Sequence, residues 1–477
     1  MAAVLGALDF TLDQVVYALC LFVSYIFSSL YYWKLLKAKT EWVKNLYMVV
    51  VANLFLFACF GKWDISQVYA PILFTYYGGK VFRKKWWMPI VNLAAVMILL
   101  SVSHFYRQFS THSIDKYVVD ITGPLMMLTI KLTSFAFDMH DSTVWLARKL
   151  PKSPRESPVR KPEDVPGSEK ESKFPVVDSA TKYETLRQYP SLLEFCGYAL
   201  LFPGLLTGPV VSFYEYRTFI NGTYYAGVDV TCEALPGRKR RALYLFTVAV
   251  LFLVIYVGYE NVYPASYVVD PEFYARPLWY RFWYVHLSNF VARSKYYFAW
   301  MIAEGSYVMI GLGFRLSAAR KPLWDRLENV NPLRIETHSD FKVLVAQWNV
   351  CTNQWLNAYV YRRLQKYYGK GSSSARASLV TYVVSAFWHG FYPGYYFMFI
   401  SSAWLTVASR MVYKNVAWPF SSTLKRVVQY VPMFILVDYI LFPFVLLDFT
   451  RSFEFYRSFW FFGHILMAIV TVVFWRK

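Results

Sequence analysis

The chain has 477 residues, a formal net charge of +20, 57% hydrophobic residues and only 17% charged residues. Soluble proteins carry about 25% charged residues, so the composition argues against a set of soluble domains. It predicts one membrane-embedded domain over residues 1–477. Because apolar runs extend along nearly the whole chain, we assign the basic excess to cytosolic loops and expect no nucleic-acid partner.

Several kinds of chemistry have no sequence signature in this chain. The five cysteines lie far apart, without a CxxC pair or metal-ligand spacing, which predicts neither a disulfide framework nor a metal site, and we expect no cofactor. No GxSxG motif is present, so a serine nucleophile of the hydrolase type is not expected. No internal repeat is visible, which argues against transporters built from inverted repeats.

The apolar runs predict an all-α polytopic membrane protein. A helix crosses the bilayer core with about 17–25 apolar residues, and we expect about ten or eleven transmembrane or re-entrant helices around a reaction chamber. The candidate segments are Val15–Trp33, Leu46–Gly61, Ile65–Gly79, Trp87–Phe105, Val118–Phe137, Leu192–Val211, Ala242–Tyr259, Phe298–Phe314, Leu379–Trp388, Tyr392–Val412, Val427–Leu447 and Phe459–Phe474.

One long stretch, residues 148–190, differs from the rest in being rich in proline, serine and charge. Such a composition cannot bury apolar surface, so we expect a flexible loop within the domain. Its many basic residues place it in the cytosol, together with the basic stretches Arg83–Lys85 and Lys34–Lys44.

The segment Leu192–Val211 presents a topological conflict. A full span there would put the basic run Arg238–Arg241 on the opposite side from the cytosolic loop. The sequence FPGLLTGP within the segment is poor material for a continuous helix, and we therefore predict a broken, re-entrant segment. Asn221 begins an Asn-Gly-Thr glycosylation sequon that would be modified only in a lumenal loop, so it tests this topology.

The stretch QWNVCTNQWLNAYVYRRLQKYYGKG begins polar and ends basic. Read as one helix, it places Trp348, Thr352, Trp355 and Tyr359 on a single face, with Asn349 and Asn353 beside that face. It can be an amphipathic interfacial helix, or the polar wall of a reaction chamber. Its basic end is a candidate site for the phosphates of an acyl donor, with three candidate residues: Arg362, Arg363 and Lys366.

His389 lies within the apolar sequence SAFWHGFYPGYYFMF. An ionisable group at membrane depth is usually paired or functional, although a histidine bonded to a backbone carbonyl is also common. A neutral histidine can take the proton of an attacking hydroxyl group and return it to a leaving thiol. An asparagine amide can donate a hydrogen bond to the oxyanion that forms on a thioester carbonyl.

These blocks give the chain a resemblance to the membrane-bound O-acyltransferases, and within them to the lysophospholipid acyltransferases. WNVCTNQWL (348–356) is similar to that branch's W-N-x-x-T-x-x-W block, and FWHGFYPGYYFMF (387–399) to its W-H-G-x-x-P-G-Y-Y block. LTGPVVSFYEY (206–216), DITGPLMMLTIKLTSFAFD (120–138) and LDFTRSFEFYRSFWFFGHI (447–465) also resemble family segments.

The resemblance implies a many-helix bundle in which His389 and Asn349 are the catalytic residues. It implies acyl-CoA as co-substrate from the cytosol, a lysophospholipid entering from the membrane lipids, and residence in the endoplasmic reticulum membrane. The residues expected to contact substrate in the chamber are Trp348, Thr352, Asn353, Trp355, Trp388 and Tyr395. Three alternatives stay open: another acyl acceptor (diacylglycerol, sterol or protein), a lipid transporter, and an inactive lipid-binding relative.

Overall fold

The computed structural model of the chain describes residues 11–110, 119–149, 179–225, 235–317, 321–337, 339–368, 373–416 and 422–474. Within these ranges the regular structure is helical, except for one antiparallel pair of two-residue strands, β1 (Arg315–Leu316) and β2 (Pro322–Leu323). The all-α fold class predicted from the sequence is confirmed.

The helices follow one another with short connections. The first half of the chain contains α2 (Leu12–Lys34), α3 (Glu41–Cys59), α4 (Lys62–Phe82), α5 (Met88–Ser110), α6 (Thr122–Lys149), α7 (Ser179–Thr185), α8 (Leu192–Ala199), η1 (Phe202–Gly204), α9 (Phe213–Ile220), η2 (Thr223–Tyr225) and α10 (Arg238–Tyr259). The second half contains η3 (Ala265–Val269), α11 (Pro271–Ala275), α12 (Leu278–Ile310), α13 (Pro332–Thr337), α14 (Phe341–Gln347), α15 (Val350–Trp355), the π-helical η4 (Leu356–Tyr361), α16 (Arg362–Tyr368), α17 (Ser373–His389), α18 (Pro393–Asn415), α19 (Ser422–Leu441), α20 (Pro443–Leu446), α21 (Phe449–Ser458) and α22 (Phe462–Phe474).

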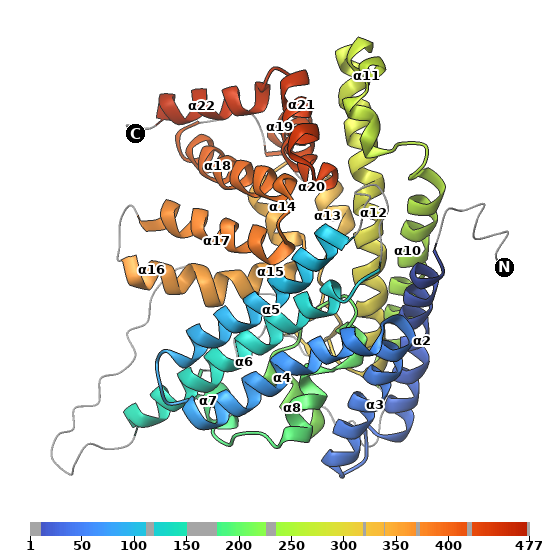
Figure 1. Ribbon diagram of the computed structural model, residues 1–477, viewed down its shortest axis with the longest axis vertical. Coiled ribbons are helices and arrows are strands. Elements are labelled where there is room, and N and C mark those ends of the chain that lie inside the picture. The colour runs from blue at the N-terminus through green and yellow to red at the C-terminus, as the bar shows by residue number, and fades with distance from the viewer. Residues whose placement is uncertain are drawn as a thin grey trace.

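Helix α12 runs through the molecule, with α10 and α2 packed along it (Figure 1). Helices α4, α5 and α6 lie side by side and lean across the view, while α16, α17 and α18 lie above one another at its left. The short helix α15 lies among these groups and contacts α6. Segments far apart in the sequence therefore meet around α15.

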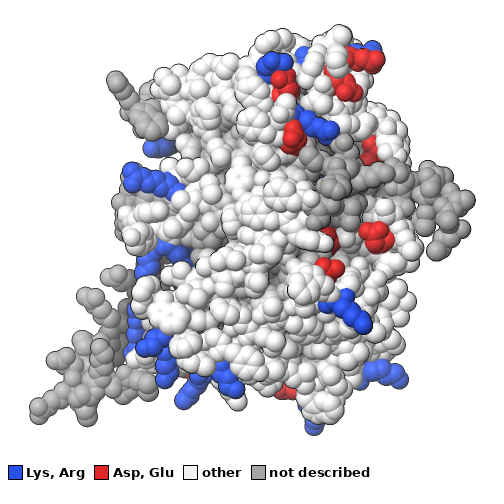
Figure 2. Space-filling model, viewed as in Figure 1, with Lys and Arg blue, Asp and Glu red and all other residues white. Residues whose placement is uncertain are grey.

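Five segments are long and apolar enough to cross a membrane: α2, α3, α5, α10 and Val428–Leu446. The pair α21 and α22, bent by 73°, counts as a sixth if it is one span. Large apolar side chains such as Ile26, Phe57 and Val254 point outward from these helices. Figure 2 shows the matching uncharged surface, with Lys and Arg gathered toward the lower left of the view. The total of about ten or eleven helices, which includes less apolar ones, stays a prediction.

Helix α12 begins much earlier than the predicted segment Phe298–Phe314, because it already starts at Leu278. The sequence analysis missed its first half because polar residues lower its hydropathy. The structure pairs those residues internally: the buried Arg293 binds Glu336 and Asp438 at 2.9 Å each. Buried charges of this kind occur where partners satisfy them.

The flexible loop predicted for residues 148–190 lies mostly outside the described residues, which omit 150–178. The prediction is wrong for the end of that stretch, where α7 forms and Leu186 is fully buried. Lys182 of α7 pairs with Asp138 of α6 at 2.8 Å. Because Asp138 lies in a buried position, this ion pair orders a segment whose composition alone resembles a linker.

The predicted break in the segment Leu192–Val211 is confirmed. Helix α8 ends at Ala199, one turn of 3₁₀-helix follows at Phe202–Gly204, and α9 begins only at Phe213. The irregular backbone between them is almost entirely buried. Such backbone survives at membrane depth only where protein surrounds it.

The two ends of this broken segment meet. Arg217 of α9 pairs with Glu194 of α8 at 2.7 Å, and Lys44 of α3 donates to the carbonyl oxygen of Ile220 at 2.9 Å. At the start of α10, the guanidinium of Arg238 lies over the Tyr32 ring at 3.6 Å. The segment therefore returns to the side from which it began, and Arg238–Arg241 lies beside the Lys34–Lys44 turn. This geometry removes the topological conflict.

We expect the exposed Asn221 to face the cytosol, because it directly follows Ile220 at the Lys34–Lys44 turn. A cysteine at Asn221→Cys should react with a membrane-impermeant maleimide in sealed microsomes, and the Asn221 sequon should carry no glycan. The matched control is Asn261→Cys, an exposed position beyond the far end of α10, which should react only after permeabilisation. The reverse labelling pattern would contradict the re-entrant topology.

Candidate active site

His389 is the last residue of α17, and Gly390 ends the helix in the left-handed region at φ +123°. Its ring is half-buried and lies against three aromatic side chains of α18 and α20: Phe399 at 5.2 Å, Tyr395 at 5.6 Å and Phe444 at 5.2 Å between ring centroids. Within the described part of the chain, no residue forms a hydrogen bond with either ring nitrogen. The imidazole can therefore accept a proton from a molecule that enters this aromatic enclosure.

His104 of α5 holds the turn that carries His389. Its Nε2–H donates to the carbonyl oxygen of Trp388 at 3.1 Å. The His104 ring lies flat against Gly390, where a Cβ atom would come within 3.1 Å of Nδ1. The sequence analysis counted His104 among seven histidines but had no signal for this contact, because 284 positions separate the two partners.

Gly394 in the same block permits another close approach. Its N–H donates to the carbonyl oxygen of Leu447 at 2.7 Å, and a Cβ atom there would lie only 2.1 Å from the carbonyl oxygen of Pro443. This approach brings α20, with Phe444, against His389. Both glycines of the W-H-G-x-x-P-G block therefore serve packing around the histidine.

Asn349 lies between α14 and α15 with φ +43° and ψ 58°, in the left-handed region that asparagine tolerates better than most residues. The buried Thr352 donates its hydroxyl proton to Oδ1 of Asn349 at 2.9 Å. Asn329 donates to the same oxygen at 3.4 Å. Asn329 was not singled out from the sequence, and no local pattern distinguishes it.

Aromatic rings connect the two motifs. The Trp348 indole packs against Trp300 and Tyr296 of α12, at centroid distances of 4.9 and 5.8 Å. Tyr296 also meets Phe444 at 6.4 Å, and Phe444 contacts His389. Residues of α12, α15, α17 and α20 thus enclose one aromatic region between Trp348 and His389.

Helix α6 anchors both motifs through hydrogen bonds. Trp355 donates from Nε1 to the Thr133 hydroxyl at 3.0 Å, and Trp388 donates from Nε1 to the Met126 carbonyl oxygen at 3.1 Å. The two indoles lie 6.1 Å apart. Both side chains are buried anchors, and the segment DITGPLMMLTIKLTSFAFD was recognised from the sequence only as a resemblance, without this role.

The prediction of one helix starting at Trp348 is wrong. The left-handed residue Asn349 separates α14 from α15, so Trp348 caps α14 and faces α12. Thr352 and Trp355 do share the buried face of α15. Tyr359 follows in the π-helical turn and donates to Asp138 of α6 at 2.9 Å.

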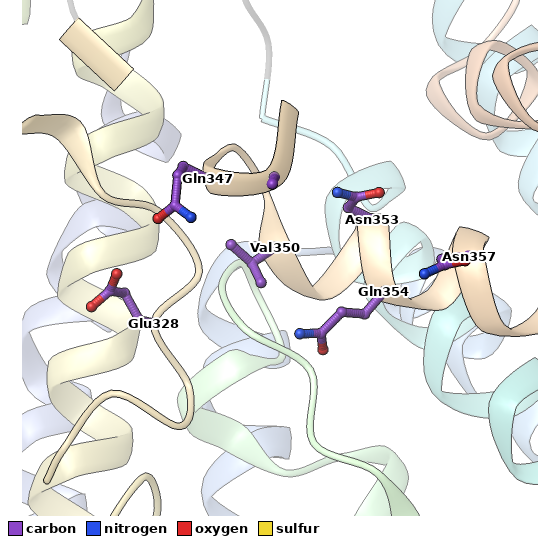
Figure 3. Close-up of a pocket in the computed structure, with 7 residues that line it drawn as sticks. Glu328, Gln347, Val350, Asn353, Gln354 and Asn357 are labelled. Carbon is purple, nitrogen blue, oxygen red and sulfur yellow. The ribbon is translucent and has the colours of Figure 1, made fainter. Parts of the chain in front are cut away.

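Asn353 faces away from Asn349 and lines a polar cavity of about 210 Å³. Figure 3 shows Asn353, Gln354 and Asn357 along one helix face, with Glu328 and Gln347 across the cavity. Asn353 also donates to the carbonyl oxygen of Val345 at 3.2 Å. The two asparagines of the W-N-x-x-T-x-x-W block therefore serve different surfaces.

The basic end of this region divides in two. Arg362 and Lys366 are exposed on α16. Arg363 instead pairs with Asp141 of α6 at 2.7 Å and covers the Phe137 ring at 4.1 Å. Arg362 and Lys366 are thus the members of the predicted cluster that are accessible to a phosphorylated ligand.

The segment Leu206–Tyr216 packs against the loop that precedes Asn349. Glu215 accepts a hydrogen bond from the Ser212 N–H at 2.9 Å and pairs with Arg326 at 2.7 Å. Burial raises the pKa of the Glu215 carboxyl, but the Arg326 guanidinium and the Ser212 hydrogen bonds outweigh burial and hold that pKa below its usual value. The ionised pair ties α9 to the loop around residues 324–331.

Comparisons with known proteins agree with this geometry. A sequence model of the membrane-bound O-acyltransferase family matches residues 107–449. The chain is 28% identical over 454 residues to the lysophospholipid acyltransferase of Schizosaccharomyces pombe, with 91% of this chain and 81% of the relative covered. It is 28% identical over 453 residues to membrane-bound glycerophospholipid O-acyltransferase 1 of Mus musculus, with 91% and 84% covered. It is 31% identical over 375 residues to membrane-bound glycerophospholipid O-acyltransferase 2 of Gallus gallus, with 75% and 65% covered.

Gly390→Ala should destabilise the protein because the new methyl group would displace the His104 ring. Gly222→Ala is the matched control, since Gly222 also has a positive φ (+84°) but no atom within 4 Å of the new Cβ. We expect both variants to carry a backbone cost of about 1–2 kcal/mol, and Gly390→Ala about 1–3 kcal/mol more from overpacking. Thermal midpoints in detergent, read by size-exclusion chromatography, should rank wild type, Gly222→Ala and then Gly390→Ala. Equal midpoints for the two variants would contradict the His104 contact.

Proposed function

Because this chain belongs to the membrane-bound O-acyltransferase family, we propose that it transfers a fatty acyl group from acyl-CoA to the free hydroxyl group of a lysophospholipid. The product is a diacyl phospholipid, and the by-product is free CoA. The names of the relatives support a lysophospholipid as acceptor. The family supports an O-acyltransferase, and the apolar helices fit an integral membrane enzyme.

The single observation that carries the proposal is the setting of His389. The ring is half-buried in a wall of Tyr395, Phe399 and Phe444. Among the described residues, none occupies its nitrogens by hydrogen bonding. A histidine that only supported the fold would normally use a ring nitrogen, as His104 does with Trp388.

In the proposed reaction, His389 removes the proton of the lysophospholipid hydroxyl group. The resulting oxygen nucleophile attacks the thioester carbonyl carbon of acyl-CoA and forms a tetrahedral intermediate. The carbon–sulfur bond then breaks, and protonated His389 returns the proton to the departing thiolate. One ester forms and one thioester is lost, so the histidine ends in its starting state.

Asn349 serves this reaction as a hydrogen-bond donor. Negative charge develops on the thioester oxygen in the transition state, and a preorganised amide N–H stabilises it. Thr352 holds the Asn349 oxygen, so the amide does not rotate freely. Trp348 and Tyr395 line the aromatic region on either side of the reacting groups, and no cofactor takes part.

The phosphates of CoA are proposed to bind at the exposed end of α16, through Arg362 and Lys366. Arg363 adds positive charge there while it remains bound to Asp141. This end lies one connection away from the Asn349 helix, so a donor bound there can extend its thioester toward Asn349. The endoplasmic reticulum is the proposed membrane, where acyl-CoA and lysophospholipids meet.

His389→Ala should lower product formation by about 100- to 10,000-fold, because the hydroxyl group loses its base. The measurement uses purified protein in detergent, labelled oleoyl-CoA and a panel of lysophospholipids. The control is His140→Ala, which removes a half-buried histidine bonded to the Arg83 carbonyl oxygen. We expect His140→Ala to remain within about threefold of wild type, since it loses one hydrogen bond worth roughly 1 kcal/mol of stability.

A diacylglycerol, a sterol and an acceptor peptide belong in the same panel. Product on one of these and not on lysophospholipid would replace the proposed acceptor. Lysolipid movement in vesicles without consumption of acyl-CoA would favour a transporter. Wild-type-like activity of folded His389→Ala would remove the histidine from the mechanism.

The double variant Arg362→Ala/Lys366→Ala should raise KM for acyl-CoA by about 3- to 10-fold with little change in kcat, because each exposed charge pair contributes about 0.2–1 kcal/mol. The matched control is Lys84→Ala/Lys85→Ala, which removes the same charge from two exposed residues elsewhere. A shift in KM of similar size in both double variants would show that only net charge matters and would contradict a phosphate site on α16.

A further inference from the structure

Asn329 lies in the loop between β2 and α13 and is fully buried. Its polar atoms point at the short stretch that contains Asn349, about 20 positions later. Its backbone oxygen accepts the Val350 N–H at 2.9 Å, and its side-chain Oδ1 accepts the Cys351 N–H at 3.0 Å. Its Nδ2 lies 3.4 Å from Oδ1 of Asn349.

These contacts replace the usual capping of a helix. The first N–H groups of a helix have no partner within it, and the residue at the N-cap commonly supplies one from its own side chain. Asn349 occupies the N-cap of α15, yet its side chain forms no capping bond. Asn329 takes the N–H groups of Val350 and Cys351 instead, which leaves the Asn349 amide available for another use.

The same contacts determine which way the Asn349 amide points. A backbone N–H can only donate, so the Asn329 atom that faces Cys351 must be its oxygen. The other terminal atom of Asn329 is then the amino group, which can only donate. The Asn349 atom that it faces must therefore be oxygen, and the Thr352 hydroxyl donates to this oxygen as well. The Nδ2 group of Asn349 points away from both, and none of the described residues accepts a hydrogen bond from it.

The loop that carries Asn329 is fixed on both sides. Arg326 pairs with Glu215 at 2.7 Å. Asn331 donates from its backbone to the Gln347 carbonyl oxygen at 3.3 Å and from its side chain to Glu328 at 3.1 Å. Asn329 is thus held in place from the segment before it and the segment after it, which a residue that orients another side chain requires.

We propose that Asn329 is a positioning residue for acyl transfer, which fixes the Asn349 amide so that its Nδ2 donates to the carbonyl oxygen of the thioester. This inference rests on the proposed acyltransferase function and adds to it the group that sets the direction of the amide. Asn329 itself touches neither substrate. Its effect on turnover passes through Asn349 alone.

The test is Asn329→Asp, which keeps an oxygen for the Cys351 N–H but replaces the amino group by a second oxygen. That oxygen repels Oδ1 of Asn349 and favours the reversed amide. We expect kcat to fall by about 10- to 100-fold, since a misdirected oxyanion donor is lost in part, while KM for both substrates changes by less than about threefold. Protonation of the new carboxyl restores a donor, so the activity of Asn329→Asp relative to wild type should rise as pH falls.

The control is Asn331→Asp, the same substitution two positions away in a loop residue without a contact to Asn349. We expect kcat within about threefold of wild type, because this site does not bear on the oxyanion donor. An Asn329→Asp variant with wild-type kcat overturns the proposal. Equal losses of kcat in the two variants, with the same pH profile as wild type, overturn it as well, since they indicate a general effect on the loop.

A binding measurement separates this inference from the proposed function. Wild type should bind a ketone analogue of oleoyl-CoA, which retains the carbonyl oxygen, more tightly than an alkyl thioether analogue, which lacks it. Asn329→Asp should lose this preference, whereas Asn331→Asp should keep it. An unchanged preference in Asn329→Asp overturns the positioning role. A wild type that shows the preference but acylates no lysophospholipid contradicts only the proposed acceptor.

Discussion

The hydrogen bonds that α6 accepts from two tryptophans hold the rest of the site in place. In an apolar interior an indole N–H has no water to bond, and an unsatisfied buried donor costs about 1–3 kcal/mol. Thr133 accepts the Trp355 proton and Met126 accepts the Trp388 proton. Because both acceptors lie on one rigid helix, Asn349 and His389, each close to one of these tryptophans, keep a fixed relative position.

The few charged residues of the chain act as ties between helices. Arg293 joins α12 to α13 through Glu336 and to α19 through Asp438, and His286 bonds to the second oxygen of Asp438 at 2.6 Å. Desolvation makes such groups costly unless every one has partners, so they are found where several helices meet. The same pairing explains why a long helix such as α12 can contain charges and still lie within the bundle.

Irregular backbone concentrates where the chemistry is proposed. Asn349 has a left-handed conformation, and Gly390 ends α17 directly after His389 in the same region of backbone space. Strained positions of this kind persist only where neighbours hold them. Here the neighbours are Asn329 on one side and His104 on the other. Each motif residue therefore depends on a polar side chain from a distant part of the sequence.

The sequence by itself determined the fold class, the break in the Leu192–Val211 segment and the two candidate motifs. Composition, apolar run length and the positions of glycine and proline report local preferences, and these features are local. Hydropathy failed at the start of α12 and composition failed at α7, where ion pairs with distant residues outweigh the local signal. Only the tertiary structure separated Trp348 from the α15 face, turned Asn353 toward a different cavity and revealed Asn329 and His104. Their contacts join residues about 20 to 284 positions apart, and such pairings depend on how helices pack, which no local pattern in a single sequence records.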